Sequence, residues 1–260
     1  MTLLLTIDAG NSNTVFGVHD GAELRAHWRL TTRREQTADE YGVLVRNLFG
    51  GSGVQPGQIE GVALASVVPP LTPVLIELSR DYLRQEPLVV EPGVKTGMPI
   101  LYEPPSDVGA DRIVNGVAAL ARYGGPVVVV DFGTATTFDV VTRKGEYAGG
   151  VICPGVGISA DALFQRAARL PRVDVRNPGR VIGRSTVASI QAGLYFGYAS
   201  MVEGLIARIR AELGEPARVV ATGGLAESLA SDIPSIEAVD PVLTLTGLRL
   251  IWERNRSTKA

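Results

Sequence analysis

The chain has 260 residues, of which 45% are hydrophobic and 20% charged, a balance typical of a folded globular protein rather than a disordered one. Its formal net charge of -2 gives no bulk electrostatic attraction to nucleic acid or to anionic membranes, so neither is expected as a partner. The single cysteine, Cys153, excludes an internal disulfide and fits a reducing compartment, so we expect a cytoplasmic protein.

Strand signals dominate the start of the chain. Three apolar or alternating runs predict strands over residues 3–7, 15–19 and 24–30. Asp20 and Gly21 separate the second run from the third, and this dipeptide is a strong hairpin signal. His19 and His27 flank the predicted turn, so we expect both to be exposed.

A helix is expected from Thr37, because Thr37 and Glu40 form a capping box ahead of apolar residues at three- and four-residue spacing. The rest of the first half predicts a strand over residues 62–67, a helix from 69 to 83, a strand over 88–90, a loop over 91–105 and a helix from about Ser106 or Asp107.

The opening pattern returns in the second half. Two motifs each follow a buried strand: Asp8-Ala9-Gly10-Asn11-Ser12-Asn13-Thr14 and Asp131-Phe132-Gly133-Thr134-Ala135-Thr136-Thr137. Their Asp, Gly and Thr residues recur at equal offsets. Two copies are too few for a solenoid, so the recurrence predicts a duplicated pair of α/β domains that face each other across a cleft.

The remaining elements follow from periodicity and glycine turns. They are a strand over 138–142, a long helix over 186–212, a strand over 218–221, the loop Thr222-Gly223-Gly224, a helix over 225–230 and a terminal helix over 246–254. The long helix carries a stripe of small residues at helical spacing: Gly193, Gly197, Ser200 and Gly204.

The two acidic motifs predict phosphate binding. A carboxylate after a buried strand can support a hydrated cation, and a glycine hairpin can turn backbone N–H groups towards an anion. For one copy alone, an ordinary Asx-type hairpin turn is an equal alternative. The second copy and the loop 222–224 favour phosphate, although that loop by itself is equally consistent with a plain tight turn.

Asp111 and Arg112 follow Gly109 and Ala110 on the first turn of a predicted helix. An acid at this place complements the helix dipole, and the arginine could simply be exposed to solvent. The flexible loop before the motif would also let a substrate approach. Physical reasoning alone leaves the structural and the functional interpretation open.

Four motifs occur in order along the chain: Asp8 to Ser12, Gly109 to Arg112, Asp131 to Thr137 and Gly183-Arg184-Ser185-Thr186. Together they resemble type III pantothenate kinases, a family of the acetate kinase, hexokinase and actin superfamily, over nearly the whole chain. Ser12 departs from the threonine usual in the family but keeps a hydroxyl. We therefore expect an α/β fold of two duplicated ribonuclease H-like (actin-like ATPase) domains, residues 1–112 and 113–260, each a mixed sheet flanked by helices, with a cleft between them.

The resemblance implies ATP-dependent phosphorylation of pantothenate to 4'-phosphopantothenate, the first step of coenzyme A biosynthesis. It implies that Asp111 is the catalytic base, that Asp8 supports Mg²⁺ through water, and that Asp131 binds a monovalent cation, K⁺ or NH₄⁺. The implied ATP site comprises Asp8, Ala9, Gly10, Asn11, Ser12, Asn13, Thr14, Val15 and Thr134. The implied pantothenate site comprises Tyr102, Gly109, Ala110, Asp111, Arg112 and Thr186.

The resemblance also implies a homodimer with the active site near the interface. The small-residue stripe of the long helix would permit close packing against a second chain, and packing within the chain is an equal alternative. Two other functions stay open: another small-molecule kinase or phosphohydrolase of the same class, and a non-catalytic regulatory protein on the same fold. The Gly109 to Arg112 motif argues against the first, and the joint presence of Asp8, Asp111 and Asp131 argues against the second.

Overall fold

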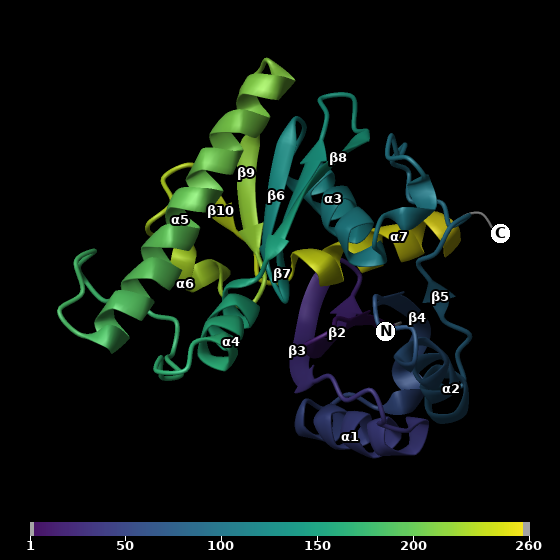
Figure 1. The fold of residues 1–260 in the computed structure, drawn as a ribbon. Helices are drawn as coiled ribbons and strands as arrows, with labels where there is room; N and C mark the ends of the chain where they lie inside the picture. Colours follow the sequence, from purple (N-terminus) through teal and green to yellow (C-terminus); the bar gives the residue numbers. More distant parts are fainter. Residues whose placement is uncertain (1–2, 257–260) are drawn as a thin grey trace. The chain divides into compact units, whose positions relative to one another are not determined.

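The computed structural model describes residues 3–256 and contains two five-stranded mixed sheets (Figure 1). The first sheet has the order β3-β2-β1-β4-β5 and consists of β1 (Leu3–Ala9), β2 (Asn13–Asp20), β3 (Glu23–Thr31), β4 (Ile59–Ser66) and β5 (Leu88–Val89). The second has the order β10-β9-β6-β7-β8 and consists of β6 (Val127–Phe132), β7 (Ala135–Val141), β8 (Tyr147–Pro154), β9 (Arg218–Thr222) and β10 (Ala238–Val239).

The two sheets share one topology. In each, the first three strands form an antiparallel meander, and the last two join in parallel on the other side of the first strand. The strands correspond in chain order, so that β1 is equivalent to β6, β2 to β7, and so on to β5 and β10. The duplication predicted from the two acidic motifs is therefore confirmed at the level of the sheets.

Helices connect and cover the strands. They are α1 (Ala38–Gly51), α2 (Leu71–Leu83), α3 (Ala110–Tyr123), α4 (Val156–Arg166), α5 (Thr186–Leu213), α6 (Ala226–Ala230) and α7 (Leu243–Arg256), with short 3₁₀ turns at Pro56–Gln58 and Pro105–Asp107. The predicted capping box starts α1, since Thr37 N–H donates to Glu40 Oε2 at 2.8 Å and Glu40 N–H to Thr37 Oγ1 at 3.3 Å.

Residue contacts divide the chain into two compact units. The first comprises residues 1–118 and 243–260, and the second comprises residues 119–242. This division runs through α3 and assigns α7 to the first unit, whereas the sequence-based division at 112 was drawn from the duplication alone. None of the helices among residues 3–256 is both long and apolar enough to cross a membrane.

The core of the first unit lies between its sheet and α1 and α2. Alternate residues of β1 face this core, namely Leu3, Leu5 and Ile7, which are at most 2% exposed. The other face of the sheet is covered by α7, whose Trp252 lies so close to Gly61 of β4 that a β-carbon there would come within 2.4 Å of the indole ring. In the second unit, α4, α5 and α6 pack on the sheet, with α5 running alongside it (Figure 1).

Some sequence-based boundaries were wrong. The helix expected from residue 106 or 107 begins at Ala110, because a 3₁₀ turn and an extended residue, Val108, precede it. The terminal helix begins at Leu243, three residues earlier than expected. The strands β8 and β10 and the helix α4 were not predicted.

The expected exposure of His19 was also wrong, since this residue is 2% exposed. His19 lies on β2 opposite Leu4, and its Nε2 is 3.1 Å from the Thr6 hydroxyl. Burial lowers the pKa of His19 to about 4, with a smaller contribution from the positive charge of Arg249. The imidazole is therefore neutral at physiological pH. His27 is exposed, as predicted.

Candidate active site

The first acidic hairpin joins β1 to β2. Asp8 is half-buried and pairs in register with Val15, and Gly10 N–H closes the loop by donating to Asn13 O at 3.0 Å. The eight residues predicted to bind ATP phosphates all belong to this hairpin: Asp8, Ala9, Gly10, Asn11, Ser12, Asn13, Thr14 and Val15. The two residues at its tip, Asn11 and Ser12, are exposed, so the loop backbone is accessible to a ligand.

Thr32, directly after β3, holds this loop and was not identified from the sequence. Its N–H donates to Ser12 O at 3.0 Å, and its Oγ1 donates to Gly10 O at 2.7 Å. Thr14 Oγ1 lies 2.9 Å from Thr32 Oγ1. A threonine that follows the end of a strand carries no sequence signal for such a role, because only the sheet register brings it to the loop.

The second acidic hairpin joins β6 to β7. Asp131 is half-buried and pairs with Thr137, and Gly133 N–H closes the loop by donating to Ala135 O at 3.0 Å. Thr134 is exposed at the tip. This residue, predicted to contact ATP, therefore occupies a place like that of the tip residues of the first hairpin.

The two hairpins differ by one residue in length. Asp8 pairs with the residue seven positions on, whereas Asp131 pairs with the residue six positions on. The structural counterpart of Thr14 is therefore Thr136. The sequence comparison had matched Thr14 with Thr137, because each lies six residues after its aspartate, and this match is wrong. Thr14 and Thr136 are both completely buried.

Two glycines pack tightly against the second hairpin. Gly155 N–H, at the end of β8, donates to Thr134 O at 3.0 Å, and a β-carbon on Gly155 would lie 2.2 Å from that oxygen. Gly223 has a φ of +94°, and a β-carbon there would lie 2.4 Å from Asp131 Oδ1. The loop 222–224 therefore lies directly beside the carboxylate predicted to bind a cation, and the chain geometry itself requires glycine at position 223.

The motif from Gly109 to Arg112 opens α3, and Asp111 stands on its first turn as predicted. Asp111 Oδ1 accepts a hydrogen bond from Arg112 N–H at 2.8 Å, and a β-carbon on Gly109 would lie 2.6 Å from the same oxygen. The Arg112 side chain is buried, with 7% of the residue exposed. The fold therefore fixes the orientation of the Asp111 carboxylate through its immediate neighbours.

A pocket of about 580 Å³ opens beside this motif within the first unit. Gly109 and Ala110 form part of its wall, together with Val67 after β4 and residues of the loop that follows β5. Its size falls in the range of pockets that bind small organic ligands. The wall is mostly apolar, and Glu91 and Asp107 are its acidic members.

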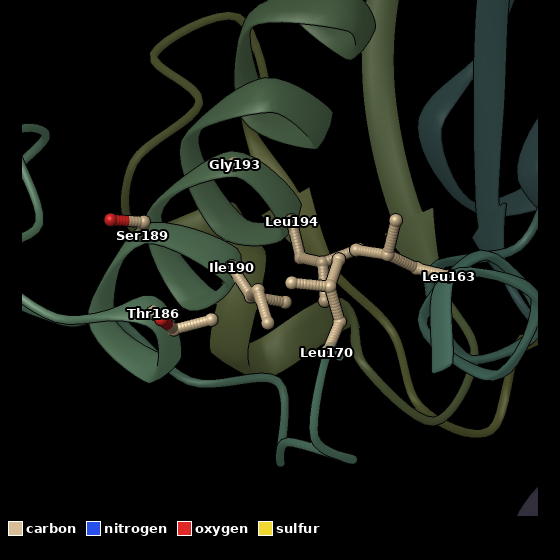
Figure 2. Close-up of a pocket in the computed structure, with 7 residues that line it drawn as sticks. All are labelled: Leu163, Leu170, Thr186, Ser189, Ile190, Gly193 and Leu194. Carbon is tan, nitrogen blue, oxygen red and sulfur yellow. The ribbon is translucent and has the colours of Figure 1, made fainter. Parts of the chain in front are cut away.

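The other two residues predicted for the pantothenate site lie elsewhere along the fold. Tyr102 is half-buried in the loop between β5 and α3. Thr186 is the exposed first residue of α5 in the second unit, after the N-cap Ser185. There it lines a different pocket, of about 490 Å³, whose wall is formed mainly by leucine and isoleucine side chains of α4, α5 and the segment between them (Figure 2).

A dedicated protein cage for a metal ion is absent from residues 3–256, where no three His, Cys, Asp or Glu side chains gather. Magnesium commonly binds one or two carboxylates together with water and substrate phosphates. A single half-buried carboxylate beside an accessible loop, as at Asp8, suits that mode of binding.

The duplicated sheets, each with an acidic hairpin after its first strand, define a fold of the actin-like ATPase class. Solved structures agree on the fold: a Baf family protein of Campylobacter jejuni has 19% identity and a TM-score of 0.62, covering 97% of this chain and 99% of that one. The inorganic polyphosphate/ATP-glucomannokinase of Arthrobacter sp. strain KM has 16% identity and a TM-score of 0.52, covering 99% of this chain and all of that one.

The particular family follows from closer matches. The family model described as type III pantothenate kinase matches residues 4–208. Type III pantothenate kinases of Moorella thermoacetica and of Anaeromyxobacter sp. strain K are 56% and 57% identical, over 97% and 98% of this chain and all of each relative. The chain belongs to the type III pantothenate kinase family and is an enzyme of that kind.

Proposed function

We propose that this chain transfers the γ-phosphoryl group of ATP to the primary hydroxyl of pantothenate. The hydroxyl oxygen forms a new bond to the γ-phosphorus while the bond from that phosphorus to the ADP oxygen breaks. The hydroxyl proton is released, and the products are ADP and 4'-phosphopantothenate. Catalysis of this kind depends on positioning and on charge neutralisation more than on covalent help.

The placement of Asp111 is the observation that supports the proposal most directly. Its carboxylate is oriented by the Arg112 N–H at the start of α3, beside the 580 Å³ pocket that Gly109 and Ala110 line. We assign Asp111 as the base that orients the pantothenate hydroxyl and accepts its proton. Proton transfer late in the reaction does not require a base with a raised pKa.

The two hairpins are the proposed nucleotide site. In the first, residues 8–15 would bind the ATP phosphates through backbone N–H groups, and Asp8 would hold Mg²⁺ through water. In the second, Thr134 would contact ATP from the exposed tip. Magnesium held by Asp8 would supply neutralisation of the phosphate charge.

Asp131 is the proposed ligand of a monovalent cation, K⁺ or NH₄⁺. Its half-buried carboxylate lies against Gly223 and Gly133, where the absence of side chains leaves backbone close to it. A carboxylate oxygen is the kind of ligand that a hard cation prefers. This donor set fits potassium better than a transition metal, which prefers imidazole or thiolate ligands.

The proposed pantothenate site comprises Tyr102, Gly109, Ala110, Asp111, Arg112 and Thr186. Arg112 suits a carboxylate partner because its guanidinium offers paired donors in a fixed plane. Thr186 belongs to the second unit and the others to the first.

We propose a homodimer with the active site near its interface. Three residues of the small-residue stripe, Gly193, Gly197 and Ser200, are exposed, and among residues 3–256 no atom other than those of the adjacent helix backbone lies within 4 Å of a β-carbon built on either glycine. In the segment before α5, Val181 and Ile182 are 68% and 81% exposed. Exposed apolar side chains and an exposed helix face of small residues both favour contact with a second chain. Light scattering should give twice the mass of one chain, and a monomer would refute this part.

Cytoplasmic location and the domain boundary after residue 112 stay proposals. A free, half-buried cysteine as the only thiol is consistent with a reducing compartment. Each proposed domain contains one acidic hairpin, as expected from duplication of a smaller ancestor.

A steady-state assay with ATP and pantothenate tests the function. We expect ADP and phosphopantothenate in equal amounts and almost no ADP without pantothenate. ATP hydrolysis that is independent of pantothenate would favour a phosphohydrolase, and turnover with glucose alone would favour a sugar kinase. The same assay in KCl and in NaCl tests the cation: we expect turnover to depend on potassium, and equal rates in both salts would contradict the role of Asp131.

A further inference from the structure

Thr32 bonds to both sides of the first acidic hairpin. Its hydroxyl donates to Gly10 O at 2.7 Å, and its own N–H donates to Ser12 O at 3.0 Å. The single hydroxyl proton of Thr32 is used for Gly10, so the hydroxyl of Thr14, 2.9 Å away, is the donor to Thr32 Oγ1. One side chain thus connects the start of the loop, the end of the loop and the buried strand that follows.

These bonds set the direction of the loop's N–H groups. In a planar trans peptide, the C=O and the following N–H point in opposite directions. With the carbonyls of Gly10 and Ser12 turned towards Thr32, the N–H groups of Asn11 and Asn13 are turned away from it. Asn11 lies at the exposed loop tip, so its N–H faces the surroundings of the loop, whereas Asn13 faces Gly10 across the closing pair of the hairpin.

We propose that Thr32 is a positioning residue for the ATP phosphates, acting through the backbone of the loop 10–13. It does not touch the nucleotide. Its hydroxyl holds the peptide plane between Gly10 and Asn11 in the orientation in which the N–H of Asn11 meets a phosphate oxygen, so that binding does not have to order the loop first. This inference depends on the proposed function, because it assumes that the hairpin binds ATP.

A purely structural role is the alternative, and Thr142 provides a matched control for it. Thr142 also follows a strand and makes comparable bonds at a hairpin turn, donating to Glu146 Oε2 at 3.0 Å and accepting from Glu146 N–H at 3.2 Å. That turn lies at the other end of β7 from the second acidic loop. Loss of its hydroxyl should therefore affect folding alone.

The test compares Thr32→Val, Thr32→Ser and Thr142→Val by their KM for ATP, KM for pantothenate, kcat and thermal unfolding. We expect Thr32→Val to raise the KM for ATP about tenfold, the effect of losing one or two hydrogen bonds, with the KM for pantothenate unchanged. Thr32→Ser keeps the hydroxyl and should restore the wild-type KM. Thr142→Val should leave the KM for ATP unchanged.

An unchanged KM for ATP in Thr32→Val, or a Thr32→Ser variant as impaired as Thr32→Val, would overturn the proposal. If the valine variant does not fold, Thr32→Ala, which cannot overpack the site, carries the same expectation. Failure of the wild-type enzyme to phosphorylate pantothenate would instead overturn the proposed function, so the two failures are distinguishable.

Discussion

The two acidic hairpins occupy equivalent places in equivalent sheets, yet different contacts hold them in shape. The first loop has two residues between its closing pair and is held by the hydroxyl of Thr32. The second has one such residue, and the N–H of Gly155 holds it as the N–H of Thr32 holds the first, so the bond from the Thr32 hydroxyl is the contact that a glycine cannot reproduce. Thr32 and Gly155 each follow the third strand of their sheet.

The difference shows that duplicated loops can change in length and in hydrogen bonding while both keep the aspartate at the end of the first strand. Shortening the second loop brings Thr134 O against the end of β8, so close that position 155 has no room for a β-carbon. In the longer first loop, the Thr32 side chain instead bonds to Gly10 O. The buried threonine hydroxyls of the two hairpins also differ. Thr14 Oγ1 bonds to Thr32, whereas no partner for Thr136 Oγ1 is found among residues 3–256.

The largest expected effect comes from a residue outside both hairpins, Asp111 on α3. Asp111→Asn keeps an oxygen that can accept from Arg112 N–H but cannot take the substrate proton. We expect kcat to fall at least about 100-fold, with ADP affinity unchanged, as measured by steady-state kinetics and calorimetry. Near-normal turnover would remove Asp111 from the mechanism.

Gly155→Ala tests the backbone contact of the second hairpin. The φ of -71° and ψ of 158° at Gly155 suit alanine, so the cost comes from backbone contacts of the β-carbon, 2.2 Å to Thr134 O and 2.6 Å to Gly133 O. We expect urea unfolding to show a loss of about 3 kcal/mol, the upper end for overpacking. Gly157→Ala, two residues on with no atom near its β-carbon, should be at least as stable as the wild type. Equal stability of the two variants would contradict the contact.

His19 adds a pH dependence to the first hairpin alone, because its counterpart on β7 is Val141. The folded-state pKa of about 4 is below the unfolded value of 6.5, so this stabilisation is complete at neutral pH and is lost as the pH falls through that window. Between pH 7 and pH 5 the wild type should lose about 2 kcal/mol more unfolding free energy than His19→Val. Parallel losses would show that His19 does not titrate as described.

The smallest effect compares the two buried threonines. Thr14→Val removes a donor to Thr32 and should cost about 1 kcal/mol of unfolding free energy. Thr136→Val removes a buried hydroxyl that lacks a partner among the described residues, so its cost should be near zero or negative. Equal costs in denaturant unfolding would mean that the hairpins are held alike.

Much of this fold was predictable because its signals are local. Buried apolar strands that end in an acid identified β1 and β6, and the capping box at Thr37 identified the start of α1. The motif resemblance identified the family, and the comparisons confirmed it.

The features that could not be predicted from the sequence depend on contacts between segments far apart in the chain. Two glycines and a proline weaken the strand signal of β8, and the exposed Ile158 and Phe164 blur the apolar stripe of α4. The burial of His19 depends on α7, more than 220 residues away along the chain. Thr32 and Gly155 have roles only because the register of each sheet places them at a loop.

The most direct test of the proposed nucleotide site is a crystal structure of the chain with a non-hydrolysable ATP analogue, Mg²⁺ and Tl⁺ in place of K⁺. We expect a phosphate oxygen at the N–H of Asn11, Thr134 against the nucleotide, and an anomalous Tl⁺ peak beside Asp131. Phosphates bound away from both acidic hairpins would contradict the claim that these loops form the ATP site.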